Sequence, residues 1–532
     1  MKYPFFKEDP NNGLSCWQRK IPYINQLIER KSMNKMRPYL LIKLLVIAVM
    51  SIGAATSIDA SSCGTECCPR TFFRARSLTQ DLVLELALSQ YRNHHQFPDV
   101  APCWLSLEVT PFYYKSRNSR ELAGYFLPNC QSCITIGENN TSDISSPWLG
   151  LTTATCDGFQ STMCICPERQ VVGAALKFYV SGESFFEGCL SRTWASLFVP
   201  VARVRTDLHI RERLTGTQGI IPELQTGIQA LNNPEWNCST FPVCKQTKSG
   251  ISDVQIKVGA DLWRDECSGG GLFVMAYLPP SNESHSCTIF EPTLGSGEHG
   301  GIGAGAYADT TFWEGCDSSL TALAEVRYLY LFKSTEVRSF DLRNCALSRY
   351  LLFANAISPQ IPFPGINFLT FPVQVTPRSN VEAWAAIHYA KCDWHVEVGY
   401  DFWWRQAEKI CLPCDPFVQQ VSVFDIVSPQ ITPQTLSTYT SASTACISQG
   451  ILSADNAPVK DAVFTPLTLQ NLNIQSAAHP KAMSSKVYGS FAWDVSVYDY
   501  CGLLGLGVSY EHAHRNSALS QVGVWVKLNM SY

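Results

Sequence analysis

The cysteines are the first residues in this chain that point to a particular chemistry. The sequence holds 22 of them, and all but Cys16 follow an apolar segment near the N-terminus. Thiols in such number outside the cytoplasm most simply form disulfides. Some lie in close pairs, such as Cys130 with Cys133, but neither a second pair nor a histidine pair follows at zinc-finger spacing. The sequence therefore predicts disulfides and no metal site.

The number of cysteines also bears on partners. Without Cys16 the count is 21, which is odd, so at least one thiol stays free or bonds to another chain. Cys63, Cys67 and Cys68 crowd the start of the exported chain and are the leading candidates for cross-links. We therefore expect a disulfide-linked oligomer.

Other reactive residues form no catalytic grouping. The ten histidines are scattered, and no HExxH, GxSxG or paired-carboxylate motif stands in a convincing context. The glycine-rich residues 295–305 lack the Gly-Lys-Ser/Thr that completes a phosphate loop. A net charge of −4 gives no sign of nucleic-acid binding. We expect no enzyme, no cofactor and no nucleic-acid partner.

An apolar segment at residues 44–55 follows several basic residues and precedes small residues ending at Ala60. This arrangement is typical of a secretory signal peptide, which we place at residues 1–60, with the true start at Met33 or Met36. No other stretch comes near 18 uninterrupted apolar residues, so the sequence excludes a helical membrane bundle.

The composition favours strands. Hydrophobic residues make up 46% of the chain and charged residues only 16%, yet the apolar residues never run together for long. Alternating strands give that result. The last strand, residues 522–532, alternates without exception and places six apolar or aromatic side chains on one face, namely Val522, Val524, Val526, Leu528, Met530 and Tyr532.

This terminal strand resembles the C-terminal strand of Gram-negative outer-membrane β-barrel proteins, with Tyr532 and Met530 where the family usually has aromatic residues. The resemblance implies that outer-membrane lipid and the barrel-insertion machinery are partners. It also implies an insertion signal made of Val524, Val526, Leu528, Met530 and Tyr532. The cysteine content is similar to that of chlamydia-type major outer-membrane proteins, which implies a disulfide-stabilised envelope in the bacterial outer membrane.

We therefore predict an all-β fold, a transmembrane antiparallel β-barrel of roughly 12–16 strands, over residues 101–532. A long polar excursion is expected at residues 406–486. Residues 61–100 form a cysteine-rich N-terminal segment with a short helix at 77–92, which either packs on the surface or plugs the barrel. An array of secreted β-sandwiches is the alternative fold.

The function that this fold predicts is a porin-like channel for passive passage of small solutes. About 14 strands would leave a lumen wider than that of an eight-stranded barrel. Charged residues on the inward faces would line the pore and set its selectivity: Asp253, Lys257, Asp261, Glu325, Arg327, Glu397, Asp401, Arg405 and Asp494. The alternatives are a cross-linked structural or adhesive surface protein, and a plugged barrel that transports hydrophobic solutes.

Overall fold

A computed structural model gives the fold of the chain. It describes residues 69–94, 105–138, 141–151, 153, 158–265, 267–280, 284–343, 345–355, 363–412, 421–425, 438–440, 446–448, 466–497 and 500–531. The predicted signal peptide, the three cross-link candidates Cys63, Cys67 and Cys68, and the terminal Tyr532 lie outside these residues.

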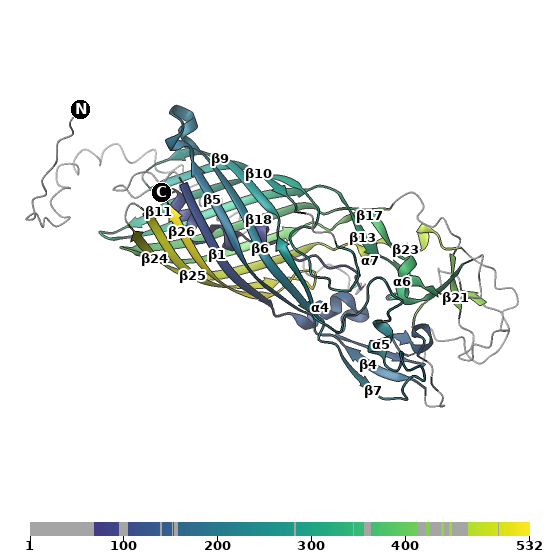
Figure 1. The fold of residues 1–532 in the computed structure, drawn as a ribbon. Helices are drawn as coiled ribbons and strands as arrows, with labels where there is room; N and C mark the ends of the chain where they lie inside the picture. The colour runs from purple at the N-terminus through teal and green to yellow at the C-terminus, as the bar shows by residue number, and fades with distance from the viewer. Residues whose placement is uncertain are drawn as a thin grey trace, which may run out of the picture.

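Twelve of the described strands form a closed antiparallel barrel (Figure 1). The order around the ring is β5-β1-β26-β25-β24-β19-β18-β12-β11-β10-β9-β6, and β6 pairs back with β5. Their bounds are β1 (Leu105–Ser116), β5 (Glu168–Ser181), β6 (Thr193–Asp207), β9 (Val254–Arg264), β10 (Ser268–Leu278), β11 (Gly301–Glu314), β12 (Ser318–Leu331), β18 (Arg378–Lys391), β19 (Trp394–Arg405), β24 (Ala482–Val497), β25 (Tyr500–Ala513) and β26 (Gln521–Ser531). The prediction of a β-barrel with 12 to 16 strands is confirmed.

The terminal strand shows why the ring closes. On β26 the outward side chains Val524, Val526, Leu528 and Met530 are 40–52% exposed, whereas the inward Trp525 and Lys527 are buried. β26 pairs with β25 on one side and with β1, the first strand of the ring, on the other. Inside the barrel, Lys527 Nζ lies 2.7 Å from Glu108 Oε1 across the β1–β26 seam. The first and last strands thus leave no unpaired edge.

The two ends of the barrel differ. Where β1 begins and β26 ends, successive strands are joined by hairpins, the longest of which contains the 3-10 helices η6 (Gly182–Ser184) and η7 (Gly188–Arg192). At the opposite end most connections are long, and several carry the strands of small sheets, seen on the right of Figure 1. In outer-membrane barrels, short turns face the periplasm and long loops face outward.

Four small sheets stand in the long connections. Their strands are β2 (Cys133–Gly137), β3 (Ile144–Ser145), β4 (Gln160–Cys164) and β7 (Arg211–Leu214); β13 (Ser334–Ser339), β17 (Thr370–Thr376) and β20 (Lys409–Cys411); β14 (Asp341–Leu342) and β23 (Leu472–Asn473); and β15 (Leu352–Asn355), β16 (Phe363–Pro364), β21 (Val421–Asp425) and β22 (Thr438–Thr440). β8 (Gln246–Ile251) extends the wall beside β6.

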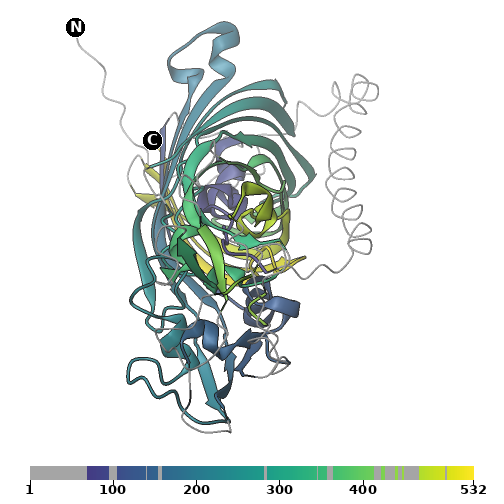
Figure 2. The same ribbon diagram turned by 90° about the vertical axis from the view of Figure 1, so that its right-hand side faces the viewer.

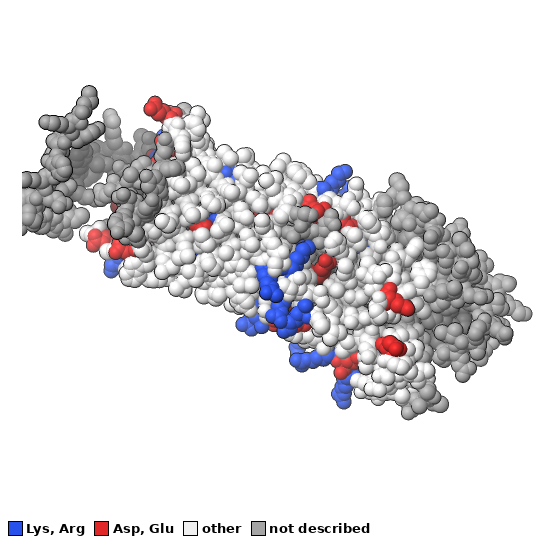
Figure 3. Space-filling model, viewed as in Figure 1, with Lys and Arg blue, Asp and Glu red and all other residues white. Residues whose placement is uncertain are grey.

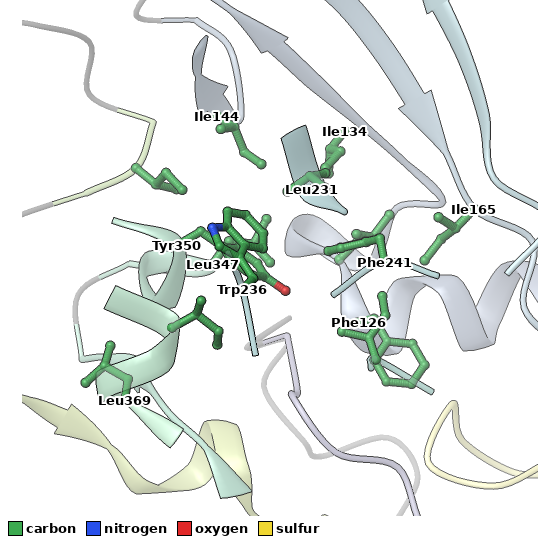
Figure 4. Close-up of a cluster of buried hydrophobic side chains, with 14 of the residues drawn as sticks. Phe126, Ile134, Ile144, Ile165, Leu231, Trp236, Phe241, Leu347, Tyr350 and Leu369 are labelled. Atoms are coloured by element: carbon green, nitrogen blue, oxygen red, sulfur yellow. The ribbon is translucent and has the colours of Figure 1, made fainter. Parts of the chain in front are cut away.

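Short helices complete these connections: α4 (Ser119–Phe126), η4 (Pro128–Cys130), η5 (Ser146–Leu149), α5 (Gly227–Leu231), η8 (Ser348–Tyr350), α6 (Gly365–Phe368), η9 (Leu469–Asn471) and α7 (Ile474–Ala477). Their apolar side chains share one core outside the ring with side chains of the small sheets, part of which Figure 4 shows. In that core Trp236 stacks on Tyr350 with ring centroids 4.7 Å apart. The long connections therefore form a folded body at the mouth of the barrel.

The N-terminal segment enters the ring. The helix expected at 77–92 is three short pieces, η3 (Leu78–Gln80), α2 (Leu82–Leu86) and α3 (Ser89–His94). Asp81 is extended and caps α2 through the N–H of Leu84, and Leu88 has a φ of 65°, so one continuous helix is broken twice. Figure 2 shows these pieces, in purple, inside the ring of strands. We call residues 69–94 the plug.

The polar excursion differs slightly from its prediction. β19 ends at Arg405, as expected, but β24 already begins at Ala482, so residues 482–486 belong to the wall. Lys486 explains the difference, since this polar residue points into the lumen and is satisfied there by Asp81. Among the described residues, none of the helices is long and apolar enough to cross a membrane.

Candidate channel and its plug

The lumen of the barrel is lined with charged side chains that contact the plug. Glu85, in α2, is the centre of the largest group. Its carboxylate lies 2.7 Å from Lys257 Nζ on β9 and 2.9 Å from Arg327 Nη1 on β12. Lys177 of β5 donates to the Glu85 carbonyl oxygen at 3.0 Å. Three strands from different parts of the ring therefore hold one residue of the plug.

Lys257 and Arg327 each have a second acidic partner, which lies on the wall of the barrel. Lys257 Nζ is also 2.9 Å from Glu325 Oε1, and Arg327 Nε donates to Glu382 of β18. All of these side chains are nearly inaccessible to solvent. A buried ion must be paired, because removing one partner leaves an uncompensated charge. The alternation of acids and bases around Glu85 meets that need.

A second group lies around Arg76 and Asp81. Arg76 Nη1 is 2.8 Å from Asp401 of β19 and 3.4 Å from Glu511 of β25. Asp81 Oδ2 lies 2.6 Å from Lys486 Nζ on β24. The plug thus contributes both a cation and an anion, each matched by the opposite charge on the wall.

Hydrogen bonds from uncharged donors and a ring contact also hold the plug. The Ser77 hydroxyl donates to Asp253 Oδ2 at 2.7 Å, and the Thr79 hydroxyl donates to the Asp253 carbonyl oxygen at 2.8 Å. The N–H of Leu88 donates to Glu397 Oε1 at 3.1 Å. Near the hairpin end, Tyr91 stacks on His388 with centroids 4.0 Å apart. The whole segment is therefore docked along the barrel axis.

The nine residues predicted to line a pore divide into seven that contact the plug or its charged partners and two that lie near the hairpin end. Six of the seven lie along the lumen, namely Asp253, Lys257, Glu325, Arg327, Glu397 and Asp401. Arg405 donates to the Arg74 carbonyl oxygen at the mouth, at 3.2 Å. The other two lie near the hairpin end, where Asp261 pairs with Arg264 at 2.7 Å and Asp494 with His395 at 2.9 Å. The side chains of the predicted pore residues are therefore paired with the plug or with neighbouring residues of the wall.

Several residues of this site were missed by the sequence analysis. On the plug these are Arg76, Asp81 and Glu85; on the wall they include Lys177, Glu382, Lys486 and Glu511. The signal was present: three charged residues at intervals of five and four stand in an otherwise uncharged segment, residues 76–85. On a surface helix, Arg76, Asp81 and Glu85 would face solvent. They are buried here because the ring of strands closes around them.

A clamp of charges lies where the plug leaves the barrel for the mouth. Arg74 Nε is 2.8 Å from Glu408, and Arg338 Nη1 is 3.3 Å from the same carboxylate. His299 Nε2 lies 2.7 Å from Glu336. Burial by itself would raise the pKa of Glu336, but Arg338 and Arg74 lower it well below its ordinary value. The Glu336 carboxylate is therefore ionised at neutral pH.

The outer face of the barrel has the opposite character. Figure 3 shows the wall as a largely uncharged surface between its two ends. Exposed apolar side chains come from every part of the ring, for example Ile256, Val274, Ile302, Val398 and Leu506, which are 40–62% exposed. On β9 the neighbours Ile256 and Lys257 face outward and inward, respectively. A continuous apolar band of this kind is what a lipid bilayer covers.

Two disulfides join pairs of described residues, and both lie outside the barrel wall. Cys133 bonds to Cys164, which joins β2 to β4, and Cys345 bonds to Cys446 within the mouth. Free and exposed thiols are found at both ends of the molecule: Cys244, Cys267, Cys287, Cys316, Cys392 and Cys411. The close pair Cys130 and Cys133 does not form one bond, since Cys133 pairs with Cys164.

The cysteines at the hairpin end follow a rule. Cys267, Cys316 and Cys392 stand in the turns of β9–β10, β11–β12 and β18–β19. Cys189 lies in η7 between β5 and β6, and Cys501 is the second residue of β25. Each of the five hairpins at this end therefore carries one cysteine, and we call the set the rim cysteines. Within the described residues, no group of three or more His, Cys, Asp or Glu could hold a metal ion.

Comparison with known proteins adds structural neighbours at low similarity. No family model and no curated protein matches the sequence of this chain. An outer-membrane channel from Pseudomonas putida F1 aligns at 8% identity over 82% of this chain and 99% of its own, with a TM-score of 0.34. The toluene transporter TodX from Pseudomonas putida aligns at 8% identity over 88% and 97%, with a TM-score of 0.29. The translocator domain of the autotransporter NalP from Neisseria meningitidis aligns at 8% over 85% and 94%, with a TM-score of 0.27.

The assignment of the fold rests on the molecule itself. Its ring is closed, antiparallel and even in strand number, with an apolar band outside, charges inside and short turns at the end that holds its first and last residues. Only closed barrels cross a membrane with strands, because every backbone group must then be paired. By fold and by location the chain is a β-barrel of the bacterial outer membrane.

Proposed function

We propose that the chain is an outer-membrane channel for small polar solutes, which residues 69–94 close in the described conformation. The observation that carries this proposal is the pairing of Arg76, Asp81 and Glu85 with charges on the inner wall. A scaffold that never opened would need no ion pairs in its lumen, since apolar packing of the same volume is as stable or more so. We assign no catalytic step and no cofactor.

The wall favours polar solutes over hydrophobic ones. Once the plug is displaced, both signs of charge remain on the inward faces, listed here by sign: Glu108, Asp253, Glu325, Glu382, Glu397, Asp401 and Glu511; Lys177, Lys257, Arg327, Lys486 and Lys527. A lumen with this lining stays hydrated and offers no continuous apolar path. Transport of hydrophobic solutes is the alternative that this lining disfavours.

The direct test compares the full chain with a chain that lacks residues 69–94, each reconstituted in planar lipid bilayers. We expect rare, brief openings from the full chain and continuous conductance from the shortened one. Equal conductance of the two, or none from a shortened chain that has folded into a barrel, would contradict the proposal. Flux of a polar sugar against a monoaromatic hydrocarbon distinguishes the two solute classes.

A second candidate function is favoured by the rim cysteines. The thiols of Cys267, Cys316 and Cys392 are free and exposed at the end that faces the periplasm. We propose that they join the barrel to other chains. The thiolate of a rim cysteine would attack a disulfide of the second chain, form a mixed disulfide and release one thiolate of that disulfide. Cys63, Cys67 and Cys68 remain predicted cross-link sites.

Replacing Cys267, Cys316 and Cys392 together by serine is expected to reduce high-mass species on non-reducing gels of native envelopes by more than half. The matched control replaces Cys244, Cys287 and Cys411, which are equally free and exposed but lie in the long connections. We expect the control to leave the gel pattern unchanged. An equal loss in both triple variants would show that position on the rim is unimportant.

A further inference from the structure

Basic side chains gather on the outer wall where it meets the long connections. Arg203 and Arg205 lie on β6 and point outward, as does Lys115 on β1. In Figure 3 a blue group of Lys and Arg stands at this level, beside the otherwise uncharged wall. The two arginines directly follow Val201 on the same face, which is 41% exposed and belongs to the apolar band.

The strand register places these residues together. Gln170 of β5 is opposite Arg205 on one side and opposite Lys115 on the other. Arg203 and Arg205 are thus about 7 Å apart along one strand, and Lys115 lies two strands from Arg205, about 10 Å away. Tyr113 lies one outward position before Lys115 and is 39% exposed. Such aromatic residues mark the level of lipid headgroups.

The guanidinium groups of Arg203 and Arg205 are unpaired within the part of the chain that the structure describes. Neither side chain has a hydrogen bond or an ion pair among the described residues. The nearest acids on this face have other partners: Glu168 lies 3.0 Å from Lys115, and Asp207 lies 3.8 Å from Lys245 and 3.6 Å from His209. Two unpaired guanidinium groups at a membrane interface are suited to bind an anion that is not part of the protein.

We infer that Arg203 and Arg205, with Lys115 beside them, bind the phosphate of a lipid headgroup in the outer leaflet. A guanidinium group binds phosphate through two parallel hydrogen bonds, and Arg is preferred to Lys at phosphate sites for that reason. The site lies at the end with long connections, which faces outward. The acyl chains of the same lipid would cover Val201 and its apolar neighbours. The inference rests on the outer-membrane location of the barrel and goes beyond its action as a channel.

The test measures binding of lipid A, a glycolipid with two phosphates, to the full chain in neutral detergent micelles by native mass spectrometry. The variant R203Q/R205Q should bind about tenfold or more weakly, which corresponds to one lost charged contact. The matched control is R211Q/R213Q. These two arginines have the same spacing on β7 and are also exposed, but they lie outside the barrel wall. The control should bind lipid A as the unchanged chain does.

Further measurements distinguish binding of the lipid phosphate from binding of the rest of the lipid and from binding of free phosphate. Dephosphorylated lipid A should bind weakly to every variant, and millimolar inorganic phosphate should not displace lipid A from the unchanged chain. Equal loss in both double variants, equal binding of the dephosphorylated lipid, or displacement by free phosphate would each overturn the inference. R203K/R205K, which keeps the charge but loses the paired geometry, should bind with intermediate strength and replaces the glutamine variant if that variant misfolds. Failure of the channel proposal would appear in bilayer conductance and leave these results unaffected.

Discussion

Replacing Asp81 with Asn and Glu85 with Gln together is expected to raise the open probability of the channel at least a hundredfold. The change leaves Lys486, Lys257 and Arg327 without their plug partners. Loss of one partner of a buried pair costs about 3–5 kcal/mol when the remaining charge has no other partner. Each 1.4 kcal/mol is tenfold in an equilibrium constant.

The expected effect is smaller than two full penalties, because the wall supplies second partners. Lys257 keeps Glu325 at 2.9 Å, and Lys486 keeps Glu511 at 3.3 Å. We therefore take about 3 kcal/mol for the two substitutions together, which is the hundredfold given above. Displacement of the plug then costs less free energy. The cations of the wall keep their second partners, and the ring of strands stays intact.

Single-channel recording in planar bilayers measures this open probability directly. The control is Glu121→Gln, which removes one carboxylate from the exposed face of α4 without touching the lumen. Heat-modifiable migration on gels establishes that each variant has formed a barrel. A correctly folded double variant with the open probability of the unchanged chain would show that these ion pairs do not hold the plug.

The wall of this barrel could be predicted because its signal is local. On β26 and β9 apolar and polar residues alternate, and the two faces of a strand report directly whether each side meets lipid or lumen. Ile256 and Lys257 show this for one pair of neighbours, which are 40% and 2% exposed. The inward direction of Lys257, Arg327 and Asp401 followed from the same alternation.

What those inward charges contact could not be predicted. Lys257 and Glu85 are 172 positions apart in the chain, and their contact depends on where the ring closes around the plug. The sequence of residues 77–92 also suggested one helix, because Ser77 is a residue type that caps helices and Leu78, Leu82 and Leu86 recur at helical spacing. The breaks at Asp81 and Leu88 arise from tertiary contacts, in which Asp81 reaches Lys486 and the Leu88 N–H reaches Glu397.

The mouth was the least predictable part. Its four small sheets pair strands from distant connections, such as β14 with β23, and most of these strands are short. Strands of two or three residues carry no readable period. The close spacing of Cys130 and Cys133 likewise said nothing about pairing, because Cys133 bonds to Cys164, which lies opposite it on the neighbouring strand β4. Connectivity of disulfides depends on the fold that brings the thiols together.

Deleting Tyr532, or replacing it with Asp, is expected to block assembly of the barrel in the outer membrane. In the sequence, Tyr532 continues the alternation of Val524, Val526, Leu528 and Met530, whose side chains are exposed on the outward face of β26. This strand pairs with β25 and with β1, so the ring cannot close without it. A ring that stays open exposes two strand edges to lipid, where each unpaired backbone group costs several kcal/mol.

The measurement is the amount of heat-modifiable barrel in outer-membrane fractions, which we expect to fall at least tenfold in either variant. Ser531→Ala is the matched control, because Ser531 is the neighbouring residue but points inward, where its hydroxyl donates to Asn529 Oδ1 at 2.9 Å. That change removes one hydrogen bond, worth about 1 kcal/mol, and leaves the apolar face complete. If the control assembles and the Tyr532 variants do not, the outward face of the last strand directs insertion. If all three assemble normally, closure of β26 onto β1 does not need the terminal aromatic residue.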